Sequence, residues 1–187
     1  MVSPATNSSI DVAYWFFGRA EKDGIYLEDE KLHHLLFLAQ SRFAQTHLGQ
    51  MLMPCLFLCD ESGFFEPNIK KMFAFGRPFM PQTRLEDNIT AFLENIWQQY
   101  SPLSLAQFKQ IVTALPLFGK TYQKGSQTVV DWNSLIDKSN DCGTIRERER
   151  GYAAPKKVLV SQNGPVVVSQ WSPRKVNSTE HKDYLHE

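Results

Sequence analysis

Apolar residues recur at the spacing of a buried helical face along most of the first 140 residues. Small polar residues come first, and Ser8 with Asp11 provides a cap, so we predict a helix that starts near Ser9 and stops at Asp23-Gly24. A second stripe runs from Asp29 to Gly49 and is rich in leucine. It predicts a second helix that is buried and central.

The middle of the chain interrupts this pattern. Residues 51–65 combine large apolar side chains, an acidic turn and Gly63, which is typical of a short strand or irregular hairpin. Pro67 suits the first turn of a brief third helix, and Gly76 with Pro78 marks its end.

Two S/T-x-x-E/Q patterns predict the next helix starts. The first joins Thr83 to Glu86, and the second joins Ser104 to Gln107 in a helix that Pro116 stops. Residues 119–127 have loop composition. Asp131 is a suitable cap for a short last helix.

These elements predict a mainly α fold, a compact multi-helix domain with a short β-hairpin insertion, over residues 10–140. Residues 1–9 are expected to be a flexible N-terminus. The predicted core consists of Phe16, Leu32, Leu35, Leu36, Phe92, Leu93, Trp97, Phe108 and Val112.

A change in composition follows the domain. Residues 141–156 form a charged linker without an apolar face. Residues 157–176 hold two β-branched runs joined through Asn163-Gly164, which predicts a C-terminal β-hairpin extension, and residues 177–187 are a flexible polar tail. An isolated hairpin is only marginally stable, so it is expected to dock on the domain or on a partner.

Composition narrows the class of protein. The 187 residues are 42% hydrophobic and carry 20 basic and 20 acidic side chains, which excludes a nonspecific DNA-coating protein. Cys55, Cys59 and Cys142 are odd in number and favour a reducing compartment. The polar N-terminus and the absence of a long apolar run predict a cytoplasmic protein that does not enter a membrane.

No cofactor or metal is expected. Cys55 and Cys59 could join His33, His34 or His47 in a zinc site, but the more economical interpretation is that the two thiols are buried hydrophobes. His33 and His34 are adjacent on a helix and cannot bind one ion together, so one of them is expected to hydrogen-bond across the core. No phosphate-binding, metalloprotease or hydrolase motif occurs, which favours a non-enzymatic role.

The order and content of these segments resemble the Panacea-domain antitoxins of bacteria and their phages, which include SocA-type and GepA-like proteins. The resemblance covers about residues 10–140 and is carried by DVAYWFFGRA, KLHHLLFLAQ, the Trp97 to Gly125 stretch and VVDWNSLIDKS. The chain departs from the family pattern in the hairpin, and Ala114 and Leu117 stand where the family has His and Trp. The resemblance implies direct contact with a partner protein, either a toxin or a component of a protease system.

Several phenylalanines crowd the segment 55–80, which is too broken by glycine and proline to bury them in one element. Aromatic side chains are favoured anchors of protein interfaces, so this segment is the expected contact region. The alternative is that these rings close the core beneath a loop, with the contact moved to the C-terminal hairpin around residues 163–171. The candidate partner-binding residues are Phe64, Phe65, Phe73, Phe75 and Phe79.

Two other functions stay open at this point. An enzyme without a recognisable motif would show a pocket holding at least two ionisable groups with shifted pKa values. A regulatory nucleic-acid-binding protein would gather the basic C-terminal residues on one face. The binding module would instead show exposed aromatic side chains near residues 55–80.

The helical assignment is testable through Leu36. Replacing Leu36 by Ala is expected to lower the free energy of unfolding by about 2–5 kcal/mol, because a cavity would open in the packed core. Urea denaturation measures this change. A loss below about 0.5 kcal/mol would place Leu36 at the surface and contradict the second helix.

Overall fold

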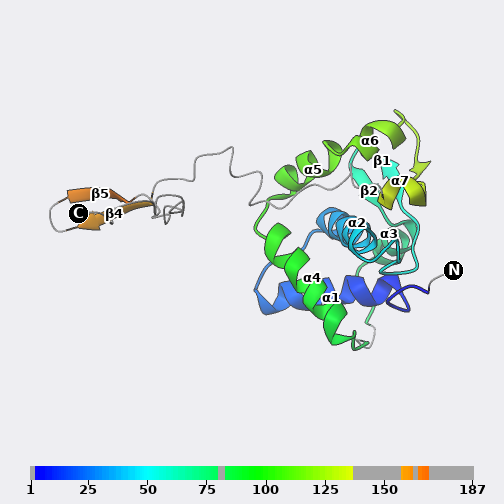
Figure 1. Ribbon diagram of the computed structural model, residues 1–187, viewed down its shortest axis with the longest axis horizontal. Coiled ribbons are helices and arrows are strands. Elements are labelled where there is room, and N and C mark those ends of the chain that lie inside the picture. The colour runs from blue at the N-terminus through cyan, green and yellow to red at the C-terminus, as the bar shows by residue number, and fades with distance from the viewer. Residues whose placement is uncertain (1–2, 80–82, 137–156, 162–163, 169–187) are drawn as a thin grey trace, which may run out of the picture. The chain divides into compact units, whose positions relative to one another are not determined.

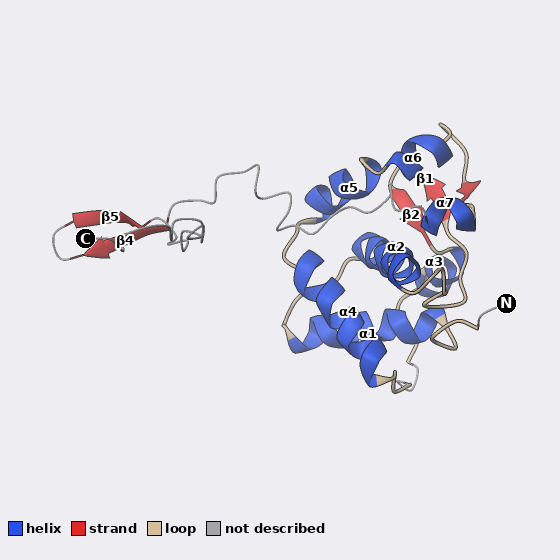
Figure 2. Ribbon diagram, viewed as in Figure 1, coloured by secondary structure: helices blue, strands red, loops and turns tan. Residues whose placement is uncertain are grey.

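The computed structural model describes residues 3–79, 83–136, 157–161 and 164–168. Residues 1–145 and 146–187 form two separate units. The first unit, here called the body, is mainly helical with a small antiparallel sheet (Figures 1 and 2), which confirms the predicted fold class. Its elements are α1 Ser9–Lys22, α2 Asp29–Thr46, β1 Leu58–Asp60, β2 Gly63–Phe65, α3 Pro67–Phe73, α4 Asp87–Tyr100, α5 Leu105–Thr113, α6 Pro116–Thr121, β3 Thr128–Val129 and α7 Trp132–Ile136.

Helix α2 is the centre of the body. It contacts α1, α4, α5, α7 and strand β2, and Figure 1 shows it among them. Every residue from 31 to 41 is buried, including Leu32, Leu35 and Leu36. The prediction of a buried central helix is therefore confirmed. The other predicted core residues are buried as well, except Phe92, which is only partly buried.

Local capping explains where several helices begin. The Ser8 hydroxyl accepts a hydrogen bond from the Ile10 backbone N–H, and Ser104 with Gln107 makes the expected capping box. The capping box predicted for Thr83 and Glu86 is wrong. Helix α4 begins only at Asp87, because the preceding segment runs extended and places Leu85 in the core.

The structure contains two elements that the sequence did not predict, helix α6 and strand β3. Pro116 opens helix α6 rather than merely ending α5, which is a common role for proline in a first helical turn. Strand β3 follows the predicted loop and pairs with β1, so the sheet order is β2-β1-β3. Asp131 caps α7 by accepting the Ser134 backbone N–H at 3.0 Å.

The hairpin and the N-terminal segment are both held to the body. In the hairpin Cys59 pairs with Phe64 and Asp60 pairs with Gly63.

Residues 1–9 were expected to lie outside the domain as a flexible segment, but the Ala5 and Thr6 backbone N–H groups donate to the carbonyls of residues 51 and 52 at 2.9 and 2.8 Å. The ordered body therefore begins before α1.

The second unit contains a two-stranded antiparallel hairpin. Strands β4 (Lys157–Ser161) and β5 (Gly164–Val168) form the predicted hairpin, but Ser161 lies opposite Gly164, so Gly164 belongs to β5 rather than to an Asn163-Gly164 turn. The charged linker of residues 141–156, residues 169–176 and the tail of residues 177–187 lie outside the described residues. None of the described helices combines the length and hydrophobicity needed to cross a membrane.

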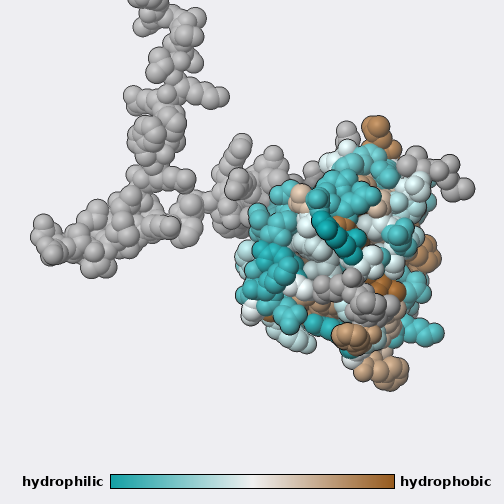
Figure 3. Space-filling model, turned by 90° about the horizontal axis from the view of Figure 1, so that it is seen from below, coloured by the Kyte–Doolittle hydropathy of each residue, from teal (hydrophilic) through white to brown (hydrophobic). Residues whose placement is uncertain are grey.

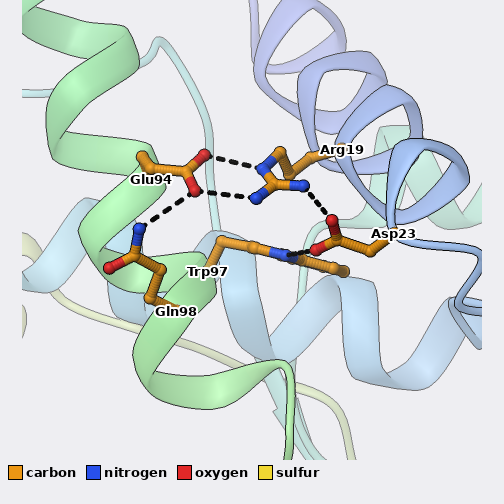
Figure 4. A network of polar contacts seen from close by, with 5 residues as sticks. All are labelled: Arg19, Asp23, Glu94, Trp97 and Gln98. Atoms are coloured by element: carbon orange, nitrogen blue, oxygen red, sulfur yellow. Dashed lines mark hydrogen bonds and ion pairs between the residues drawn. The ribbon is translucent and has the colours of Figure 1, made fainter.

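A polar network joins α1 to α4 (Figure 4). The Arg19 guanidinium donates two hydrogen bonds to the Glu94 carboxylate, at 2.7 and 2.9 Å, and a third to Asp23. Asp23 also accepts the Trp97 indole N–H at 2.8 Å, and Gln98 donates to Glu94 at 3.2 Å. The hydrogen bond from Trp97, then that from Arg19, lowers the pKa of Asp23, while the hydrogen bonds from Arg19 lower the pKa of Glu94.

This network predicts a loss of stability in acid. A carboxylate whose pKa is lower in the folded state stabilises the fold above its unfolded pKa, and this contribution disappears as the pH falls through the folded pKa. We expect Glu94→Gln to lower the free energy of unfolding by up to about 1 kcal/mol at pH 7, with the difference vanishing in strong acid. Denaturant titrations between pH 7 and pH 2 measure it, with the exposed Glu61→Gln as control. A constant difference at all pH values would contradict the ionic origin.

Candidate functional site

The five candidate phenylalanines divide into two groups. Phe64, Phe65 and Phe73 are buried, so they are not surface anchors, and this part of the predicted contact site is wrong. Strand β2 packs directly on α2, which brings the Phe64 ring parallel to Phe37 with the ring centroids 4.0 Å apart. Phe73 packs edge-on against Phe17 at 5.4 Å. Phe64 and Phe73 close the core, as the alternative interpretation expected, and Phe65 is buried outside that core cluster.

Phe75 and Phe79 lie in the other group and are fully exposed, at 101% and 99%. The loop that carries them, residues 74–79, is attached to the body at Arg77 and Pro78, which lie between the two rings in the sequence. Arg77 stacks its guanidinium 3.6 Å from the centre of the Phe17 ring and donates a hydrogen bond to the Leu27 carbonyl at 2.9 Å. The Tyr14 hydroxyl donates to the Pro78 carbonyl. The loop therefore presents two phenyl rings to solvent from fixed attachment points.

Other exposed hydrophobic side chains are scattered over the body. On the face drawn in Figure 3 they stand out singly from a largely polar surface rather than forming one continuous apolar patch. Isolated exposed hydrophobic residues are ordinary in folded proteins. The loop 74–79 differs because two fully exposed aromatic rings occur within five residues of each other on an anchored segment.

A cavity of about 460 Å³ lies beside this loop, among the start of α2, the β1–β2 hairpin and α3. Its size is that of a site for a small molecule or a large side chain. Two histidines from α2 reach it, and Asp60 and Lys70 are the charged residues contributed by the hairpin and by α3. Its lining includes His33, His34, Asp60, Phe65, Lys70 and Phe73.

His34 is buried without a hydrogen bond of ordinary geometry. Its side chain is 1% exposed, its ring packs edge-on against Phe108 at 5.6 Å, and neither ring nitrogen has a hydrogen-bond partner among the described residues. Burial lowers its pKa to about 4, although the charge of Glu30 and a weak interaction with the Phe64 backbone, which falls outside hydrogen-bond geometry, act in the opposite direction. The imidazole is therefore neutral at pH 7.

Gly63 makes this arrangement possible. Its φ of +124° lies in a region that L-residues rarely adopt, and a Cβ atom at this position would come within 2.8 Å of His34 Cε1. The backbone of the hairpin can thus lie directly against the imidazole. A side chain at residue 63 would force the hairpin and α2 apart.

His33 is held by a hydrogen bond across the core, as expected for one member of the pair. Its Nδ1 accepts the Glu66 backbone N–H at 3.4 Å, which leaves the proton of the neutral ring on Nε2. Burial, followed by the charge of Lys70, lowers the pKa of His33 to about 4. Both histidines therefore line the cavity in their neutral form at pH 7.

Asp60 and Lys70 carry the opposite charges at the cavity. The Asp60 carboxylate accepts the Ser62 backbone N–H at 2.8 Å, and its other oxygen lies 3.6 Å from the Lys70 ammonium. That ammonium is also 4.0 Å from the centre of the Phe65 ring, within the range of a cation–π interaction. Lys70 is 53% exposed, so its ammonium reaches this position from the protein surface.

Cys55 and Cys59, the two cysteines among the described residues, show no features of a reactive or metal-binding pair. Burial raises the pKa of Cys59 to about 11 and raises that of Cys55 further, so both thiols are protonated at neutral pH. Among the described residues no three His, Cys, Asp or Glu side chains lie together as they would around a metal ion.

Sequence reasoning did not identify the cavity. It singled out the histidine pair, but the pairing of His33 and His34 with Asp60 and Lys70 depends on how the hairpin folds back onto α2. Two adjacent histidines on an otherwise leucine-rich buried face were the available signal. No family model, curated protein or solved structure matches the chain.

The unpaired imidazole is testable by substitution. We expect His34→Leu to raise the free energy of unfolding at pH 7 by about 1 kcal/mol, because it removes a buried polar group that has no hydrogen bond of ordinary geometry. Gln40→Leu is the matched control, since Gln40 is equally buried on α2 but exchanges two hydrogen bonds with the Met53 backbone, at 3.1 and 3.0 Å. This control should lose about 1–3 kcal/mol. Equal losses in both variants would show that His34 is paired.

The same histidines predict a pH dependence. Unfolded histidine has a pKa of about 6.5, whereas His33 and His34 have pKa values of about 4 in the folded protein. Between these values only the unfolded chain takes up the protons, so the free energy of unfolding should fall as the pH drops from 6.5 to 4. His34→Leu should flatten this slope in chemical denaturation. An unchanged slope would assign the titration to other groups.

Proposed function

We propose that this protein is a non-enzymatic binding module that acts by forming a stoichiometric complex with a partner protein. The observation that carries the proposal is the pair of fully exposed rings, Phe75 and Phe79, on the anchored loop 74–79. Exposing two phenyl rings to water is unfavourable, and a partner with apolar pockets for them would remove that cost.

The attachment of the loop supports the same role. Binding is weakened by the entropy lost when a flexible segment becomes ordered, and a segment that is already fixed loses less. Arg77 and Tyr14 hold the backbone of this loop at the two points described above. Large aromatic anchors on a fixed backbone are typical of the residues that dominate interface energies.

The resemblance to Panacea-domain antitoxins supplies the class of partner. It favours a toxin that this protein neutralises, or a target that it delivers to a protease as an adaptor. The hairpin in which the chain departs from the family pattern ends at the buried strand β2, and Phe75 and Phe79 lie outside it. The proposal places this activity in the cytoplasm.

An enzymatic role has one observation in its favour. The cavity contains His33 and His34, two ionisable groups with strongly shifted pKa values, which is the feature expected of an active site. However, an imidazole with a pKa of about 4 is a weak base at neutral pH. The ring nitrogens of His34 are also enclosed. Binding is therefore the better-supported function of the cavity as well.

A nucleic-acid-binding role would depend on the C-terminal basic residues. Arg146, Arg148, Arg150, Lys156, Arg174 and Lys175 lie outside the described residues, and Lys157 is described only in its backbone. The described part of the body contributes no observation that favours this role over protein binding.

Substitution of the exposed rings tests the proposed function. We expect Phe75→Ser with Phe79→Ser to reduce capture of the partner from native lysate at least tenfold, about 1.4 kcal/mol, without changing the melting temperature. Captured proteins are quantified by mass spectrometry. Leu48→Ser is the matched control, because Leu48 is equally exposed but lies just beyond α2.

The opposite result is equally informative. Unchanged capture by the folded double variant would remove the loop 74–79 from the interface. The contact would then have to be sought elsewhere, with the C-terminal hairpin around residues 163–171 as the next segment to substitute.

A further inference from the structure

One position in the cavity is suited to a positively charged group. The face of the Phe65 ring and the carboxylate of Asp60 converge on one point, and the ammonium of Lys70 occupies it, 4.0 Å from the ring centre and 3.6 Å from the carboxylate oxygen. An aromatic face beside a carboxylate is the combination that recognises ammonium and guanidinium groups.

Lys70 is held there loosely. Its separation from Asp60 exceeds hydrogen-bond length, and its side chain is half exposed. Ion pairs of this kind contribute about 0–1 kcal/mol. Because the lysine stem starts from the surface of α3, a rotation of the side chain would move the ammonium into water and leave the position free.

The rest of the cavity also favours a cation. Its lining contains three carboxylates, from Asp29, Glu30 and Asp60, against the single ammonium of Lys70. Glu30 has only a distant ion pair among the described residues, with the Lys109 ammonium at 4.0 Å. His33 and His34 are neutral at pH 7 and add no positive charge. The walls formed by Phe65 and Phe73 can cover an apolar stem.

We propose that this cavity binds an organic cation, a primary ammonium or guanidinium group on an apolar stem, and that Lys70 occupies the cation position until the ligand displaces it. Two sources share this chemistry. One is a lysine or arginine side chain of the partner protein, and this source rests on the proposed function. The other is a free small amine, which does not depend on that function.

Calorimetric titration of the full-length protein with agmatine tests the proposal. Lys70→Ala should tighten binding at least threefold, because it removes the internal competitor. Asp60→Asn should weaken binding at least threefold, while its amide oxygen can still accept the Ser62 N–H. Lys71→Ala is the matched control, since Lys71 is the exposed neighbour of Lys70 and does not line the cavity.

The opposite signs of the two effects separate this proposal from a general loss of structure, which would weaken binding in both variants. Acetate serves as the probe of opposite charge. The proposal is overturned if agmatine shows no saturable binding to wild-type protein or to Lys70→Ala, if Lys70→Ala weakens agmatine binding, or if acetate binds more tightly than agmatine through Lys70.

A second pair of measurements distinguishes the sources. A blocked pentapeptide with one central arginine should bind, and saturating agmatine should reduce partner capture, if the partner supplies the cation. Binding of agmatine without the peptide, and without an effect on capture, supports a free amine. Because agmatine binding is measured without the partner, failure of the Phe75 and Phe79 experiment would leave this result intact.

Discussion

The middle of helix α2, residues 31–41, is buried on all sides, and the rest of the body is arranged around it. A helix in this position must place even its polar side chains in the interior, where each needs a hydrogen-bond partner. Lys31 donates to the carbonyls of Ser101 and Leu103 at 2.9 and 2.7 Å, and Ser41 donates to the carbonyl of Leu135 at 3.0 Å. These bonds tie α2 to the segment after α4 and to α7. His34 is an exception, since its ring makes no hydrogen bond of ordinary geometry with the described residues.

That exception lies where the other candidate functional features occur. The hairpin reaches His34 only because Gly63 lacks a side chain, and the same hairpin supplies Asp60 and Phe65 to the cavity. The following helix supplies Lys70, and the loop after it carries the exposed phenylalanines. One continuous segment, residues 60–79, therefore contains the cation position and both exposed rings. Departures from the rules of stable packing are commonly found at functional sites, where stability is sacrificed for binding.

The sequence predicts the elements better than their contacts. Helical periodicity and local caps such as Ser8 and Ser104 depend on neighbouring residues, so they can be recognised directly. The cap predicted at Thr83 failed because burial of Leu85 outweighed a local signal. Strand β3 was missed because two residues gain strand character only by pairing with β1. For the same reason, the sequence could not say which phenylalanines face solvent, since the answer depends on how β2 packs against α2.

The protonation of the two α2 histidines tests this account most directly, because their neutrality follows from the burial of α2 and determines the charge of the cavity. Nuclear magnetic resonance can follow the imidazole signals of the protein's five histidines from pH 8 to pH 3. The account predicts that two of them, assigned to residues 33 and 34 by substitution, stay neutral until the pH approaches about 4. Midpoints near 6.5 for both, in the folded protein, would show that the first turns of α2 are open to water and would contradict the account.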